Sequence, residues 1–261
     1  MHLRAALVPV ALASIAISAF AAAPANSFNL VSTSGKNIGN ASYTITKDKN
    51  GWHIVGKFQY HLGSSTQANT NTGDTHMGSS VMYNEGQFNE DFKVSDDGNF
   101  LSGYTQNSTN QMMTSFQSSK NSSEVVINQI QGGAGQAHNV TMPKPNFLIV
   151  PDFDPATLQI FLTTALAHPH DDKTYLFLVP AGSNPRGKEA PLYVILQLAP
   201  DTPSGTLDGK SVNLMHYIVA YHTGKADVYT DDTGTLMQAD MGPLNVSYIR
   251  AKFSLAAAPA K

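Results

Sequence analysis

Residues 41–62 read ASYTITKDKNGWHIVGKFQYHL, two alternating runs joined by a polar turn. In the second run Trp52, Phe58 and Tyr60 fall on one side of a period of two, which is typical of a strand with one buried face. The Asn-Gly dipeptide at 50–51 tolerates the positive φ angles that tight hairpins need. The stretch therefore predicts an antiparallel hairpin with one apolar and one polar face.

Short runs of strand-like residues continue through most of the chain, with one exception in the middle. Residues 154–168 form an apolar stretch that begins with Asp154, a good helix cap, and Pro155, which suits the first helical position. Large sheets tend to curl. The pattern therefore predicts a mainly β protein, in which a strongly curved antiparallel sheet or an open barrel is wrapped around one central helix at about 154–168.

Three segments carry more specific expectations about strands. Residues 212–222 and residues 244–255 each read as one uninterrupted strand. Residues 131–138, QGGAGQAH, are rich in glycine and polar side chains and are expected to be a flexible connection.

The N-terminal segment predicts export. Arg4 precedes an uncharged apolar run, and Ala23 and Ala25 supply the small residues of a cleavage site, so residues 1–25 are expected to be a signal peptide. Residues 26–255 are then a single β-rich domain, and residues 256–261 a disordered tail. No second apolar run is long enough to span a membrane, so we expect no transmembrane segment after cleavage and a periplasmic or secreted protein.

Composition excludes several classes of function. The chain has no cysteine, which removes disulfides, a cysteine nucleophile and thiolate metal ligands. Its formal net charge is −3 and it contains no basic run, so nucleic acid is not an expected partner. No nucleotide-binding fingerprint is present, and we expect no cofactor.

Three short patterns resemble those of secreted bacterial domains of unknown function, which are similar in layout to the LolA/LolB-like lipoprotein carriers. They are Gly35-Lys36-x-x-Gly39-x-Ala41-x-Tyr43-x-Ile45, Asp48-x-Asn50-Gly51-Trp52 and Tyr229-x-Asp231-Asp232-x-Gly234-x-Leu236. The resemblance implies a strongly curved antiparallel sheet around helices, with an apolar cavity inside. It implies no catalytic residue.

The leading hypothesis is a non-enzymatic binder of a lipid or another apolar small molecule, or of an envelope partner protein. In a curved sheet the apolar stripes of the strands form both the core and the wall of any cavity. The residues expected to contact such a ligand are Trp52, Phe58, Tyr60, Phe161, Leu162, Tyr217 and Tyr221. The competing interpretation is that these side chains are ordinary core.

Two other functions remain open at this point. His168 and His170, next to two aspartates, and His216 and His222, on one face of a strand, could hold a metal ion in a metal-dependent hydrolase. The competing interpretation is a helix end followed by a turn, and two ordinary strand histidines. The third function is an envelope-structural protein whose edge strands pair with a partner.

Overall fold

Within the residues that it describes, the computed structural model has a large sheet, a small sheet and one α-helix. The described residues are 26–61, 85–109, 111–119, 121–149, 154–180, 188–221 and 224–256. The predicted signal peptide, the last five residues of the predicted tail and His222 lie outside these ranges. No helix in the described ranges is long and apolar enough to cross a membrane.

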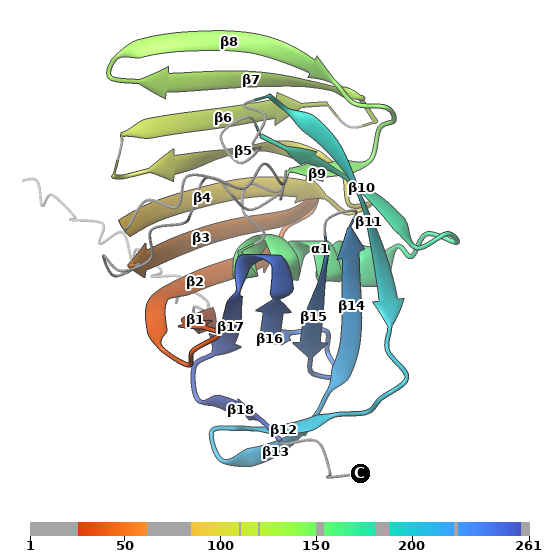
Figure 1. The fold of residues 1–261 in the computed structure, drawn as a ribbon. Helices are drawn as coiled ribbons and strands as arrows, with labels where there is room; N and C mark the ends of the chain where they lie inside the picture. The colour runs from red at the N-terminus through yellow and green to blue at the C-terminus, as the bar shows by residue number, and fades with distance from the viewer. Residues whose placement is uncertain are drawn as a thin grey trace, which may run out of the picture.

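The first half of the large sheet is a meander in which each strand pairs with the next (Figure 1). Its strands are β1 (Asn26–Ser32), β2 (Asn37–Lys47), β3 (Gly51–His61), β4 (Glu85–Ser95), β5 (Phe100–Asn107), β6 (Met112–Ser118), β7 (Glu124–Gln131) and β8 (Ala134–Thr141).

The second half runs from β17 (Val246–Arg250), which pairs with β1, out to β9 (Phe147–Ile149). Between these two lie β16 (Leu236–Met241), β15 (Gly224–Thr230), β14 (Met215–Tyr221), β11 (Ala190–Leu198) and β10 (Thr174–Val179). A short 3-10 helix, η2 (Gly242–Leu244), joins β16 to β17. The pairs are antiparallel except for β9 with β10.

The predicted hairpin is confirmed as β2 and β3, which pair from Gly39 with Tyr60 to Lys47 with Trp52. Gly51 has a φ of 149°, and a Cβ placed there would collide with the carbonyl oxygen of Val94 on β4. The turn therefore needs glycine for two reasons, its own backbone conformation and the close approach of the next strand.

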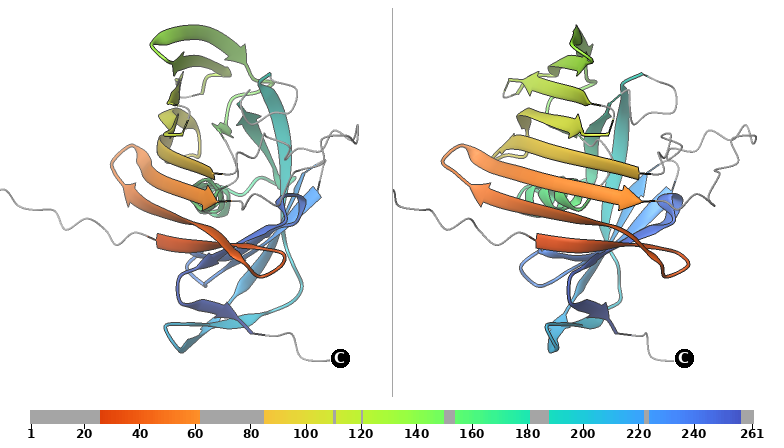
Figure 2. Two further views of the ribbon diagram at one scale, coloured as in Figure 1. Left: turned by 60° about the vertical axis from the view of Figure 1, so that its left-hand side comes forward. Right: turned by 90° about the vertical axis from the view of Figure 1, so that its left-hand side faces the viewer.

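The predicted helix is confirmed as α1 (Pro155–Ala167), with Asp154 as its N-cap. The Asp154 carboxylate accepts hydrogen bonds from the backbone N–H groups of Ala156 (2.7 Å) and Thr157 (3.1 Å). Ten of the thirteen residues of α1 are buried, including the polar residues Thr157, Gln159 and Thr164. It contacts β2, β3 and β16, and Figure 2 shows it between the two halves of the sheet.

The predicted class is therefore confirmed as mainly β, with a large antiparallel sheet and one α-helix among the described residues. The sheet is not closed into a barrel, because β8 and β9 end the strand order without pairing with each other.

The two long strands predicted near the C-terminus are each broken in two, and the prediction of single strands was wrong. Residues 212–222 divide at Leu214 between β13 (Lys210–Asn213) and β14, and residues 244–255 divide between β17 and β18 (Phe253–Leu255). With β12 (Ser204–Leu207), β13 and β18 form a separate three-stranded sheet. Leu214 is buried with Met237 and Phe253 in a small core of its own, which explains the break.

Candidate functional site

Four aromatic side chains from three strands meet on the side of the sheet that carries α1. Phe58 and Tyr60 of β3 have ring centroids 5.7 Å apart, and the ring of Phe58 lies 6.2 Å from that of Phe88 on β4 and 6.2 Å from that of Tyr248 on β17. Phe58, Tyr60 and Phe88 are partly exposed, whereas Tyr248 is buried. We call Phe58, Tyr60, Phe88 and Tyr248 the aromatic cluster.

The position of the cluster follows from the period of the strands. Gly56 lies under α1, since a Cβ on it would be 3.1 Å from the Cβ of Ala156. Phe58 and Tyr60 are two and four residues further along β3 and so point to the same side of the sheet. The cluster therefore continues the α1-facing surface beyond the N-terminal end of the helix.

Gly86 fixes the orientation of the Tyr60 ring. The two residues are opposite each other in the β3–β4 pair, and a Cβ on Gly86 would be 2.5 Å from the Tyr60 ring. The missing side chain lets Tyr60 lie over the β4 backbone, where its ring stacks on that of Phe88 at 6.2 Å and 16°. Stacked and edge-on aromatic pairs of this kind are favourable beyond the area that they bury.

The other predicted ligand-binding residues lie elsewhere. Phe161 and Leu162 of α1 and Tyr217 of β14 are 1%, 0% and 8% exposed and belong to the core. The Phe161 ring meets those of Tyr175 and Phe177 edge-on, with centroids 5.2 Å and 4.9 Å away.

Trp52 and Tyr221 are both partly buried at the border of that core. Trp52 lies at the start of β3, with the Lys47 ammonium 4.8 Å from its ring centroid. Burial raises the pKa of Tyr221 to about 12. Of the seven predicted residues, only Phe58 and Tyr60 are in the aromatic cluster.

His168 and His170 follow the end of α1, and each is held by a backbone carbonyl group. The His168 Nε2 atom bonds to the Asp96 carbonyl oxygen, and the His170 Nδ1 atom lies 2.8 Å from that of Thr174. Both histidines line a small hollow with Asp97. Its volume of about 30 Å³ is room for about two water molecules, far less than a lipid needs.

His216 lies on the opposite face of the sheet, away from the other two histidines. Its neighbours Tyr217 and Val219 on β14 are buried on the α1 side, which places His216 outside. Its ring stacks on that of Tyr229, the residue opposite on β15, at 4.6 Å and 18°.

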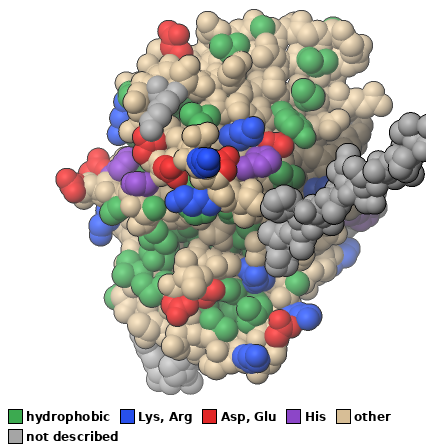
Figure 3. All heavy atoms as spheres, turned by 180° about the vertical axis from the view of Figure 1, so that it is seen from behind, with side chains coloured by type: hydrophobic (Ala, Val, Ile, Leu, Met, Phe, Trp, Pro, Cys, Tyr) green, Lys and Arg blue, Asp and Glu red, His purple; other side chains and the backbone are tan. Residues whose placement is uncertain are grey.

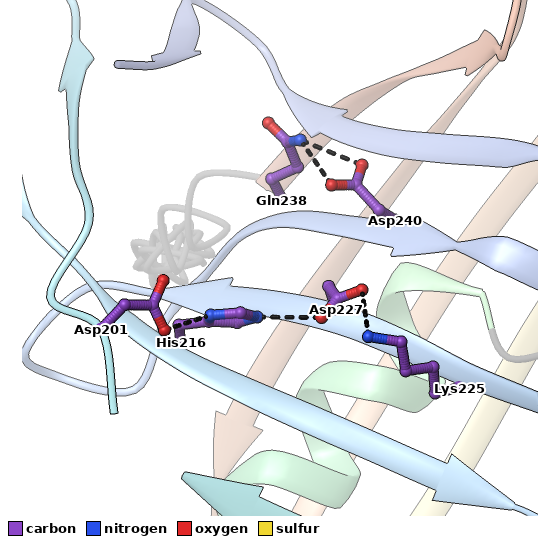
Figure 4. Close-up of polar contacts among 6 residues, drawn as sticks. All are labelled: Asp201, His216, Lys225, Asp227, Gln238 and Asp240. Carbon is purple, nitrogen blue, oxygen red and sulfur yellow. Dashed lines mark hydrogen bonds and ion pairs between the residues drawn. The ribbon is translucent and has the colours of Figure 1, made fainter. Parts of the chain in front are cut away.

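Two carboxylates lie at opposite ends of the His216 ring (Figure 4). The Nδ1 atom is 2.7 Å from Asp201 Oδ1, and the Nε2 atom is 3.1 Å from Asp227 Oδ1. Both contacts are hydrogen bonds when both ring nitrogens carry hydrogen. Asp227 also pairs with the Lys225 ammonium at 3.5 Å, and next to it Gln238 donates to Asp240 at 3.0 Å.

This outer polar cluster has its own electrostatics. The hydrogen bond from His216 lowers the pKa of Asp201. Burial raises the pKa of Tyr229 to about 12, and the negative charges of Asp240, Asp227 and Asp201 act in the same direction. Carboxylates on opposite ring nitrogens cannot share one ion with the imidazole. Across the described ranges, no group of three or more His, Asp or Glu side chains could hold a metal ion.

Large apolar side chains are also exposed outside the aromatic cluster. Figure 3 shows hydrophobic side chains gathered in the lower part of one face, below a band of charged and histidine side chains. Among the large apolar residues exposed elsewhere on the molecule are Val55 of β3 (39%), Leu166 of α1 (41%) and Leu198 of β11 (55%). A test of ligand binding at the cluster therefore needs a control at one of these positions.

Sequence reasoning missed Phe88, Tyr248 and Asp201. Phe88 is directly opposite Phe58 in the β3–β4 pair, but 23 residues separate the two strands, so no turn in the sequence sets this register. Tyr248 and Asp201 reach their partners through the pairing of distant strands, for which the sequence carries no local signal.

Comparisons with known proteins leave the function open. No family model matches the chain, and no curated protein matches it. Among solved structures, the chain is similar to the crystal structure of a β-barrel-like protein of a domain of unknown function, DUF1849, from Brucella abortus. The two are 9% identical, with a TM-score of 0.45, over 89% of this chain and 97% of that one. The predicted resemblance to lipoprotein carriers is not shown by these comparisons.

Proposed function

We propose that this protein is an exported, non-enzymatic binding protein that takes a lipid or a similar apolar molecule against the aromatic cluster. The observation that carries the proposal is the partial exposure of Phe58, Tyr60 and Phe88 on the side of the sheet where most apolar side chains are fully buried. In this proposal the curved sheet is an open barrel around α1, and the ligand packs beside the helix against the same face of the sheet.

The chemistry of the cluster suits an apolar ligand. Aromatic faces and edges supply most of the contact area, and tyrosine adds a polar hydroxyl group to an otherwise apolar ring. Small-molecule sites are usually apolar walls with a few polar groups of this kind. The preset ring of Tyr60 over Gly86 favours binding, because little side-chain freedom is lost when a ligand packs on it.

The single tryptophan makes the proposal testable by fluorescence. The probe is cis-parinaric acid, a fatty acid that fluoresces when shielded from water and accepts energy from tryptophan. Trp52 is six residues from Phe58 along one strand, or about 20 Å. Binding at the cluster is expected to raise the probe's emission and to reduce that of Trp52.

A matched pair of variants locates the binding. Phe58→Ser removes a ring from the cluster and should weaken binding about tenfold, which is about 1.4 kcal/mol. Val55→Ser is on the same strand but on the other face, and should bind as the unmodified chain does. Circular dichroism checks that both variants fold. Absence of probe binding, or equal binding by the two variants, would overturn the proposal.

Phe161 and Leu162 are poor positions for this test. Because they are 1% and 0% exposed, a charged residue at either would unfold the core whatever the ligand does. The export part of the proposal has a separate measurement. The intact mass of the protein from the envelope of its host should correspond to loss of residues 1–25; an uncut chain would contradict it.

A further inference from the structure

The ends of the two sheets differ in how well they are protected from pairing with another chain. Within the described residues, β8 and β9 end the large sheet, and β13 and β18 end the small one. All three residues of β9 are buried. β13 has four residues and begins with Lys210, and β18 has three. An edge strand is usually protected from pairing by being short, by being covered by other parts of the chain, or by carrying a lysine.

Over the part of the chain that the structure describes, β8 has none of these protections. It is eight residues long, and seven of these residues are exposed. Its sequence AGQAHNVT contains no lysine, arginine, acidic residue or proline. All eight residues pair with β7 without a register shift, so no bulge turns the strand away. Figures 1 and 2 show β8 at the outer end of the sheet, with no described strand beyond it.

The strand is also held in place. The His138 Nε2 atom lies 2.8 Å from Glu189 Oε1, just before β11, so β8 is tied to the other half of the sheet. Its inner edge is fixed by pairing with β7 along the whole length of the strand. An ordered edge loses little freedom when a further strand is added, which favours pairing.

We propose that β8 pairs in antiparallel orientation with β8 of a second copy of this chain, forming a two-fold symmetric dimer with a continuous sheet. A second copy brings the same unprotected strand, so one contact covers two exposed edges. Isologous contacts of this kind are the commonest in homo-oligomers.

The symmetry restricts the register. Residues directly opposite each other in an antiparallel pair have their side chains on the same face of the sheet. The two-fold axis that relates the two strands must therefore pass next to one residue, because an axis between two residues would set side chains of opposite faces against each other. An axis beside Ala137 pairs residues 134–140 and sets Gln136 opposite His138 of the partner subunit. An axis beside His138 would bring two imidazoles together, which costs energy when they are charged. The Ala137 register avoids this and places the small side chain of alanine at the centre.

An edge contact buries less than the about 1,600 Å² of a standard interface, so the dimer should be weak and concentration-dependent. Because the chain has no cysteine, Ala137→Cys introduces its only thiol. In an antiparallel pair the opposing Cα atoms are about 4.5–5.5 Å apart, within the range that a disulfide spans. Under mild oxidation the variant should form a reducible covalent dimer.

Asn128→Cys is the matched control. Asn128 is opposite Ala137 on β7, on the same face but one strand in from the edge, and should crosslink at least about tenfold more slowly. Equal crosslinking of the two variants would mean random collision and would overturn the proposal.

Sedimentation equilibrium gives a second measurement that needs no crosslink. The unmodified chain should pass from monomer to dimer as its concentration rises, and Ala137→Lys, which sets two charges opposite each other, should stay monomeric. The proposal would be overturned if the chain stayed monomeric at every concentration, even if β8 paired with a strand of some other protein. So would a dimer that Ala137→Lys leaves intact, because it would use another surface.

Discussion

The hydroxyl group of Tyr43 donates a 2.8 Å hydrogen bond to the side-chain carbonyl oxygen of Gln159, although the two residues are 116 positions apart. The same oxygen accepts a 2.7 Å bond from the backbone N–H of Leu236, and the Gln159 amide nitrogen donates to the Gly234 carbonyl at 2.9 Å. One buried side chain on α1 thus joins β2 to the turn between β15 and β16.

Replacing Gln159 should therefore cost more than a typical core substitution. Gln159→Leu leaves the N–H of Leu236 and the hydroxyl of Tyr43 buried without an acceptor, and we expect the free energy of unfolding to fall by about 3 kcal/mol. Tyr43→Phe removes one bond only and should cost about 1 kcal/mol. Urea unfolding measures both; similar losses for the two variants would show that Gln159 does not act as a shared acceptor.

The cap of α1 gives a second stability prediction. Asp154→Ala removes an acceptor for two backbone N–H groups and for the Thr157 hydroxyl, and should lower the free energy of unfolding by about 1–2 kcal/mol. Asp154→Asn keeps a side-chain oxygen and should recover most of that loss. If the asparagine variant were as unstable as the alanine variant, the capping bond would not be the source of the effect.

Acid should weaken the contact between Asp201 and His216. The native state lowers the pKa of Asp201, so the carboxylate contributes stability above its unfolded pKa of about 3.9 and loses that contribution as the pH falls through the lower native value. The difference in unfolding free energy between the unmodified chain and Asp201→Asn should be constant near pH 5 and shrink as the pH falls below about 4. A difference that grew with acid would contradict the direction of the shift.

Where local chemistry determines the structure, the sequence predicts it well. The β2–β3 hairpin depends on Asn50 and Gly51, and α1 on Asp154 and Pro155, which are neighbours in the chain. These signals need no information about distant residues. The same is true of the alternation that places Phe58 and Tyr60 on one face.

The wrong strand predictions include two stretches of the chain. Residues 131–138 were expected to be a flexible connection, and that prediction was wrong, because they hold the end of β7, a two-residue turn and the first five residues of β8. Gly132 and Gly133, with φ of 58° and 84°, make a tight turn that lays a sequence without strand character against β7. The strand expected at 212–222 is broken because Leu214 is buried with Met237 and Phe253, which are distant in the sequence.

The candidate site was predicted only in part, because it combines neighbours on one strand with residues from strands that are distant in the sequence. Phe58 and Tyr60 are neighbours on one strand, but Tyr248 joins them only because β17 pairs with β1. The histidine hypothesis needed four residues to meet. His216 instead lies on the outer face between Asp201 and Asp227, which no local pattern in its own strand specifies.

Tyr229 offers a test of the outer polar cluster at high pH. Its pKa of about 12 exceeds the ordinary tyrosine value, so between about pH 10 and pH 12 the native state binds more protons than the unfolded state. The stability that comes from its neutral phenol is complete below pH 10 and declines as the pH rises through 12. Tyr229→Phe should make the alkaline loss of stability shallower.

A second variant tests what raises the pKa of Tyr229. Tyr221 has a similar pKa of about 12 from burial alone, whereas Tyr229 also faces Asp240, Asp227 and Asp201. Removing one charge with Asp240→Asn should therefore lower the pKa of Tyr229 and leave that of Tyr221 unchanged. NMR titration of the tyrosine ring carbons resolves the two residues. Equal shifts in both would mean that the substitution loosens the sheet rather than removing a local charge.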